Sequence, residues 1–156
     1  MKARARLLGH PVHQMLIVFP LGLLATAVVF DLIALVSGNA GWWLVSYWTM
    51  AAGIIGALVA APFGFVDWLS IPRNTRARRI GLMHGLGNGV VALLFLASWL
   101  LRSQGGEAPA LALVLSFAAA ALSLLTAWLG GELVARLGVG VYEDANVNAP
   151  NSLHSH

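Results

Sequence analysis

The sequence contains no cysteine and few charged residues. The lack of cysteine excludes disulfide bonds, thiolate metal sites, iron–sulfur ligation and covalent haem attachment through a Cys-x-x-Cys-His motif. Charged residues make up only 10% of the 156 positions, whereas a soluble domain carries roughly a quarter. Hydrophobic residues make up 59%, and the mean hydropathy is +0.81. The composition therefore predicts an integral membrane protein.

Four apolar segments are long enough to cross a bilayer, which requires roughly 20 residues each. The connectors between these segments are short, so neighbouring helices should run antiparallel. We predict an all-α protein, a four-helix transmembrane up-down bundle within residues 1–142, followed by a flexible cytoplasmic tail over residues 143–156. The predicted spans are residues 13–36, 43–69, 80–101 and 109–134.

The basic residues predict how the bundle sits in the membrane. If four spans alternate in direction, every lysine and arginine except Arg102 falls on one side. Positive residues are retained on the cytoplasmic side, so both termini should lie in the cytoplasm and the protein in the bacterial inner membrane. The basic excess suits anionic lipid head groups, which makes the lipid bilayer the predicted partner and disfavours nucleic acid. The pattern does not indicate an oligomeric state.

Ionisable side chains inside the spans are costly and are functional candidates by default. Pro11 suits the first turn of a helix, which places His10 at or before the helix start and His13 in the first turn. Other polar residues are expected at a similar depth near the cytoplasmic boundary. They are Asp67 at the end of the second span, His84 and Asn88 on one face of the third, and Glu132 at the end of the fourth.

Asp31 is the exception, because it lies in the outer half of the first span. It follows His13 by about five helical turns, which places both side chains on one helix face. One interpretation is a hydrogen bond to Ser46, Tyr47 or Trp48 across the first hairpin. The other is an outer station of a proton or ion path that runs along the His13 face.

The two helical hairpins have similar ends. Each hairpin begins with a histidine, His13 or His84, and ends with a carboxylate after glycine, Asp67 or Glu132. Two parallel repeats related by an axis along the membrane normal would bring these residues together. The sequence therefore indicates an internal two-fold relation between the hairpins.

Three interpretations of this polar layer remain open. In the first, the side chains pair with one another or with loop arginines, and the protein is a structural membrane subunit with no cofactor. In the second, the bundle holds haem b between neutral imidazoles. The haem-binding candidates are His13 and His84, with His10 and Asn88 near them, and Asp31, Asp67 and Glu132 would be secondary groups or a proton path.

The third interpretation is a metal-ion or proton site, because mixed imidazole and carboxylate ligands suit Zn, Fe or Mn. Its ligands would be His10, His13, Asp67, His84 and Glu132. A hydrolytic enzyme is disfavoured, because no serine nucleophile has a recognisable setting beside these histidines. An electron-transfer or binding subunit fits the sequence better than a stand-alone enzyme.

Several motifs resemble a known family. They are Gly9-His10-Pro11-Val12-His13, Phe30-Asp31, Phe65-Val66-Asp67-Trp68, an arginine-rich connector before His84, Trp128-Leu129-Gly130-Gly131-Glu132-Leu133 and Gly138-Val139-Gly140-Val141. Together they resemble, over residues 7–142, the bacterial four-helix membrane family known as domain of unknown function 2231. By position, the family motif residues are His10, His13, Asp31, Asp67, His84 and Glu132.

The resemblance implies a four-helix membrane fold. Some members look to be joined to Rieske-type or cytochrome c domains, which implies membrane redox chemistry and redox partner proteins. We therefore predict a redox-associated subunit that binds haem b through His13 and His84, with His10 as a helix cap or a supporting group.

Overall fold

The computed structural model describes residues 1–152, and it begins with a short element that the sequence did not predict. Strand β1 (Arg6–Leu7) pairs antiparallel with β2 (His10–Pro11). The turn between them has positive φ angles at both Leu8 and Gly9, as a two-residue hairpin requires. His10 therefore lies on a hairpin strand, two residues before the first helix begins at Val12.

The first span is broken near its start. Helix α1 (Val12–Leu16) ends one residue before α2 (Val18–Ser37) begins. Pro20 accounts for the break, because a proline has no N–H and its ring clashes with the carbonyl four residues earlier, here that of Leu16. The two helices still form one membrane-length segment, Val12–Ser37.

The other three spans are continuous helices. They are α3 (Gly41–Leu69), α4 (Arg76–Leu100) and α5 (Ala110–Gly131), the last extended by one turn of π-helix, η1 (Glu132–Arg136). Within residues 1–152, four helical segments are long and apolar enough to cross a membrane. The predicted all-α four-helix bundle is confirmed, with span limits within a few residues of those expected.

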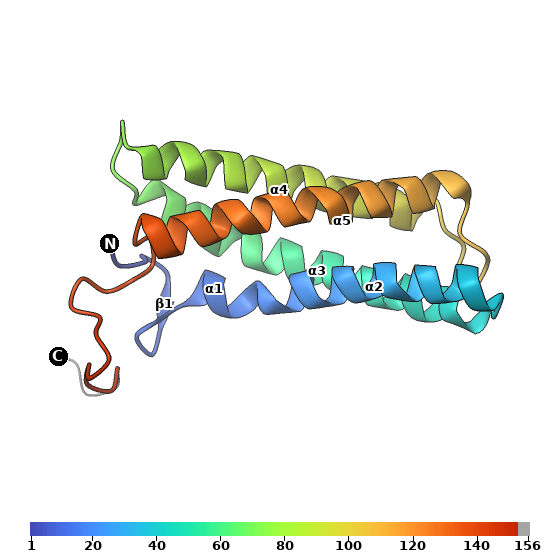
Figure 1. Ribbon diagram of the computed structural model, residues 1–156, viewed down its shortest axis with the longest axis horizontal. Helices are drawn as coiled ribbons and strands as arrows, with labels where there is room; N and C mark the ends of the chain where they lie inside the picture. The colour runs from blue at the N-terminus through green and yellow to red at the C-terminus, as the bar shows by residue number, and fades with distance from the viewer. Residues whose placement is uncertain (153–156) are drawn as a thin grey trace.

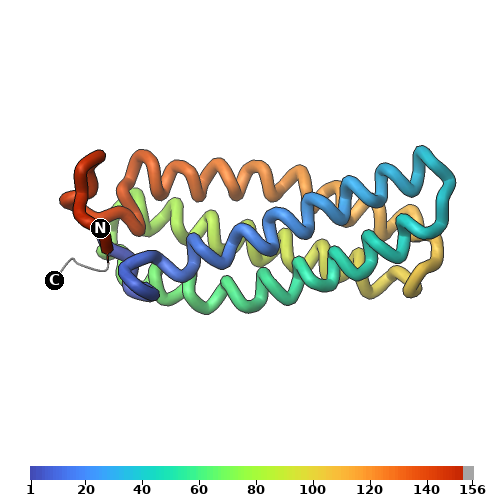
Figure 2. Tube along the Cα trace, turned by 90° about the horizontal axis from the view of Figure 1, so that it is seen from below, coloured from blue at the N-terminus to red at the C-terminus, as the bar shows by residue number. Residues whose placement is uncertain are grey.

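The helices lie side by side in an elongated up-down bundle (Figures 1 and 2). Helix α2 packs mainly against α3, and α4 mainly against α5, so each sequential hairpin is the tightest unit. The N-terminus, the C-terminal segment as far as residue 152 and the arginine-rich connector before α4 lie at one end, which we call the basic end (Figure 1). The connectors after α2 and α4 lie at the opposite end, which we call the distal end.

The middle of the bundle is apolar. A buried cluster joins all four long helices, and its members are Leu24, Ala27, Val28, Met50, Ile54, Val91, Phe95 and Ala119. Most large hydrophobic side chains outside this cluster are exposed, as expected where helices face lipid. The cluster lies between two polar layers, one at the basic end and one toward the distal end.

Candidate functional site

His13 is fixed against helix α3 by two close contacts. Its Nδ1 lies 3.0 Å from the carbonyl oxygen of Ala60, and because a carbonyl only accepts, Nδ1 is the nitrogen that carries the hydrogen. The imidazole lies over Gly64, where a Cβ atom would come within 2.7 Å of the ring. The ring is thus held by a backbone acceptor on one turn and a glycine on the next.

His84 has the same arrangement in the second hairpin. Its Nδ1 lies 2.8 Å from the carbonyl oxygen of Thr126 on α5. The imidazole lies over Gly130, where a Cβ atom would approach Cε1 to 3.0 Å. Each histidine therefore donates its Nδ1 hydrogen to the second helix of its own hairpin and packs on the glycine four residues further along.

His84 also has a polar neighbour on its own helix. The amide nitrogen of Asn88 lies 3.2 Å from Nε2 of His84, and the Asn88 carbonyl oxygen accepts a hydrogen bond of 3.0 Å from the Thr126 hydroxyl. The same amide nitrogen donates to the backbone carbonyl of His84 at 2.9 Å and lies 3.4 Å from the ring Nδ1, so it lies over the imidazole face and not along the Nε2 lone pair. The prediction that Asn88 shares the His84 face is confirmed.

The two histidines share one layer at the basic end. They belong to different hairpins, and each reaches the equivalent point on its partner helix, Ala60 or Thr126. The internal two-fold relation indicated by the sequence therefore has a counterpart in these contacts.

The two carboxylates of this layer, Asp67 and Glu132, bind groups other than the histidines. Asp67 accepts hydrogen bonds from the backbone amides of Arg4 and Ala5, at 2.7 and 2.9 Å, and so holds the N-terminal segment over the end of α3. Glu132 forms an ion pair of 2.6 Å with Arg76 at the start of α4. Within residues 1–152, no three His, Asp or Glu side chains are grouped to hold a metal ion. The five-residue metal site is therefore not supported.

His10 does not join the other histidines. Its side chain is exposed on the β-hairpin, and its Nε2 lies 3.3 Å from the hydroxyl of Ser152 in the C-terminal segment. Pro11 takes the N-cap position of α1 without a side-chain cap bond. The predicted helix-capping role of His10 is therefore wrong, because the hairpin strand turns it away from the helix start. Residues 153–156 of the predicted flexible tail lie outside the described residues.

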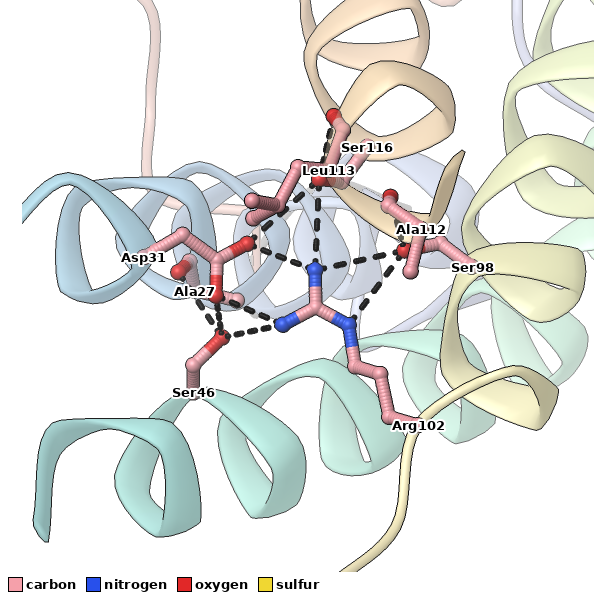
Figure 3. A network of polar contacts seen from close by, with 8 residues as sticks. All are labelled: Ala27, Asp31, Ser46, Ser98, Arg102, Ala112, Leu113 and Ser116. Atoms are coloured by element: carbon pink, nitrogen blue, oxygen red, sulfur yellow. Dashed lines mark hydrogen bonds and ion pairs between the residues drawn. The ribbon is translucent and has the colours of Figure 1, made fainter. Parts of the chain in front are cut away.

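Asp31 forms the second polar layer, toward the distal end (Figure 3). Its carboxylate is fully buried and accepts two hydrogen bonds from the guanidinium of Arg102, at 2.6 and 2.7 Å. Ser46 donates to the same carboxylate at 2.6 Å, as the sequence had suggested. The hydroxyls of Ser98 and Ser116 lie 3.3 Å from the guanidinium. All four long helices therefore surround one ion pair.

Sequence reasoning missed Arg102 as the partner of Asp31. The available signal was that both residues were exceptions, Asp31 as the only acid in the predicted outer half of a span and Arg102 as the only basic residue on the predicted outer side. The apolar cluster around Leu24 and Ile54 separates this network from the histidines. The structure gives no support to a polar path from Asp31 to His13.

Comparison with known proteins places the chain in a family. No curated protein and no solved structure matches it. A family profile described as "Predicted membrane protein (DUF2231)" matches residues 9–143, which span strand β2, all four membrane helices and the residues just beyond η1. The chain therefore belongs to this family of predicted membrane proteins.

Proposed function

We propose that this protein is a redox-associated subunit of the bacterial inner membrane that binds haem b through His13 and His84. The observation that carries the proposal is that both imidazoles donate Nδ1–H to a backbone carbonyl. A histidine ligand commonly has this bond, because it fixes the tautomer and leaves the Nε2 lone pair for the metal. Haem iron needs only two such ligands, whereas the metal site needed carboxylates that are engaged elsewhere.

The surroundings of the imidazoles fit a bound cofactor. Gly64 and Gly130 let each imidazole pack directly against a helix backbone, and the Asn88 amide nitrogen lies over the His84 ring, 3.2 Å from Nε2 and 3.4 Å from Nδ1. Four-helix bundles commonly hold cofactors between side chains of facing helices. The haem would supply one-electron transfer, and His13 and His84 would hold and orient its iron.

The basic end offers groups for the haem propionates. The connector between α3 and α4 carries Arg73, and the first turn of α4 carries Arg79. Neither guanidinium has an ion-pair partner within residues 1–152, whereas Arg76 pairs with Glu132. Arg73 and Arg79 are therefore the proposed propionate contacts. We place this end in the cytoplasm, because it collects every basic residue except Arg102.

The experiment is an absorption spectrum of protein purified in detergent from haem-replete cells, before and after dithionite reduction. Soret and α bands are expected in the wild type and should be lost in His13→Ala and His84→Ala. The matched control is His10→Ala, which removes an exposed imidazole and should leave both bands unchanged. A colourless wild-type preparation would contradict haem binding and favour a structural subunit in which the histidines only join helices.

Orientation is tested separately. A reporter fused after residue 156 should read cytoplasmic. A periplasmic signal would contradict the proposed topology without bearing on haem, because the ligand geometry does not depend on which side the basic end faces.

A further inference from the structure

We infer that the buried ion pair of Asp31 and Arg102 determines which hairpin packs against which, so that α2–α3 pairs with the equivalent hairpin α4–α5. We call this ion pair the pairing key. The two hairpins pack against each other through their inner faces. Because Asp31 lies on one inner face and Arg102 on the other, each face packs well only against a hairpin with the opposite charge at the equivalent position. The inference concerns assembly of the bundle and does not depend on haem.

The first observation is a constant spacing along the chain. Asp31 and Arg102 are 71 residues apart. The same separation relates His13 to His84, which make equivalent contacts in the two hairpins. Asp31 and Arg102 therefore occupy the same position in two repeats, although one is an acid and the other a base.

The second observation is a matching contact beside the key. In the first hairpin the Ser46 hydroxyl, whose hydrogen is shared with Asp31, lies 3.1 Å from the carbonyl oxygen of Ala27, and in the second the Ser98 hydroxyl donates to the carbonyl of Ala112 at 2.6 Å. Ala27 lies as many residues before Ser98 as Asp31 lies before Arg102. In the same way, Ser46 lies as many residues before Ala112 as Ala60 lies before Thr126. The same pair of positions meets in both hairpins, with the donor on opposite helices.

A physical consequence follows from equivalent positions that touch each other. Residues related by a two-fold axis can meet only near that axis, so the ion pair lies between the hairpins and not at an arbitrary point. If the α2–α3 hairpin packed against a copy of itself, Asp31 would face a second aspartate. Like charges in a dry interior repel strongly, and buried polar pairs can fix which elements associate. The key therefore selects the α4–α5 hairpin as the partner.

The test exchanges the two halves of the network in the full-length protein. A transposed variant carries each residue of three equivalent pairs at the other position of its pair. Its substitutions are Asp31→Arg, Arg102→Asp, Ala27→Ser, Ser98→Ala, Ser46→Ala and Ala112→Ser. If the hairpins are equivalent, this exchange turns these three pairs by half a turn and leaves Ser116, whose equivalent position is Met50, unchanged. The transposed variant should then regain at least half of the yield and melting temperature lost in Asp31→Arg alone.

The matched control carries the same charges at positions that are close but not equivalent. It combines Asp31→Arg with Arg102→Ser and Ser116→Asp, because Ser116 already lies 3.4 Å from the Asp31 carboxylate. Membrane yield and apparent melting temperature in detergent are measured for all variants, so a protein that fails to fold is scored as a loss. Recovery in the transposed variant but not in the control supports the key. Equal loss in both, or equal recovery in both, would overturn the equivalence of Asp31 and Arg102.

Discussion

The glycines beneath the two histidines allow a quantitative test of the site. An alanine Cβ at position 64 would lie 2.7 Å from Cε1 and 2.9 Å from Nδ1 of His13, closer than real contacts allow. The ring cannot move away without weakening the bond from Nδ1 to the Ala60 carbonyl. Overpacking costs about 1–3 kcal/mol, and alanine gains about 1 kcal/mol over glycine in a helix. We therefore expect Gly64→Ala to lose up to about 2 kcal/mol of stability.

The second hairpin supplies a graded comparison and a neighbouring control. At Gly130 the nearest approach of an added Cβ to the His84 ring is 3.0 Å, so Gly130→Ala should be milder than Gly64→Ala. At Gly131 an added Cβ would meet nothing within 4 Å. Gly131→Ala should therefore gain up to about 1 kcal/mol from helix propensity alone.

The assay is reversible unfolding in mixed micelles, followed by circular dichroism, with the absorption spectrum recorded on the same samples. The expected order of stability is Gly131→Ala, then wild type, then Gly130→Ala, then Gly64→Ala. The haem bands should weaken in the two variants that displace an imidazole and stay unchanged in Gly131→Ala. The reasoning fails if Gly64→Ala is as stable as Gly131→Ala, because the His13 ring would then not rest on that glycine.

Three further predictions concern the ion pairs and the N-terminal segment. Arg102→Gln should lose about 3–5 kcal/mol in the same unfolding assay, because it leaves the Asp31 charge buried without its partner; a loss below 1 kcal/mol would contradict this. Arg76→Gln should change stability by less than about 1 kcal/mol, since its pair with Glu132 is half exposed. Asp67→Leu should expose the first ten residues to faster proteolysis, whereas Asp67→Asn, which keeps an acceptor for the two backbone amides, should not.

The fold could be predicted because membrane helices follow directly from apolar length. Both limits of each predicted span lie within about four residues of the limits of the observed span. Pro20 interrupts the first span, as its missing N–H requires. The β-hairpin at Arg6–Leu7 and His10–Pro11 was missed, because two-residue strands carry no periodic pattern. Its turn depends on a positive φ at Leu8, which the residue type does not indicate.

The site could be predicted only as a list of residues at one depth. Sequence spacing places His13, His84 and Asn88 near the basic end, and the structure agrees. Spacing cannot show that each Nδ1 reaches a carbonyl on the neighbouring helix, because that depends on how the two helices are rotated against each other. For the same reason the sequence grouped Asp67 and Glu132 with the histidines, although the structure commits them to backbone amides and to Arg76.

Arg102 and Asp31 are each unfavourable at their positions alone, and each provides the charge that compensates the other. Arg102 lies at the end of the bundle opposite all the other lysines and arginines, and a lone carboxylate in a membrane helix is costly. Each residue alone would be selected against, but together they form a bidentate pair with Ser46 and Ser98 beside it. Asp31 belongs to the first hairpin and Arg102 follows the first helix of the second, so neither residue finds its partner within its own hairpin. Assembly of the two hairpins thus supplies the charge that each one lacks.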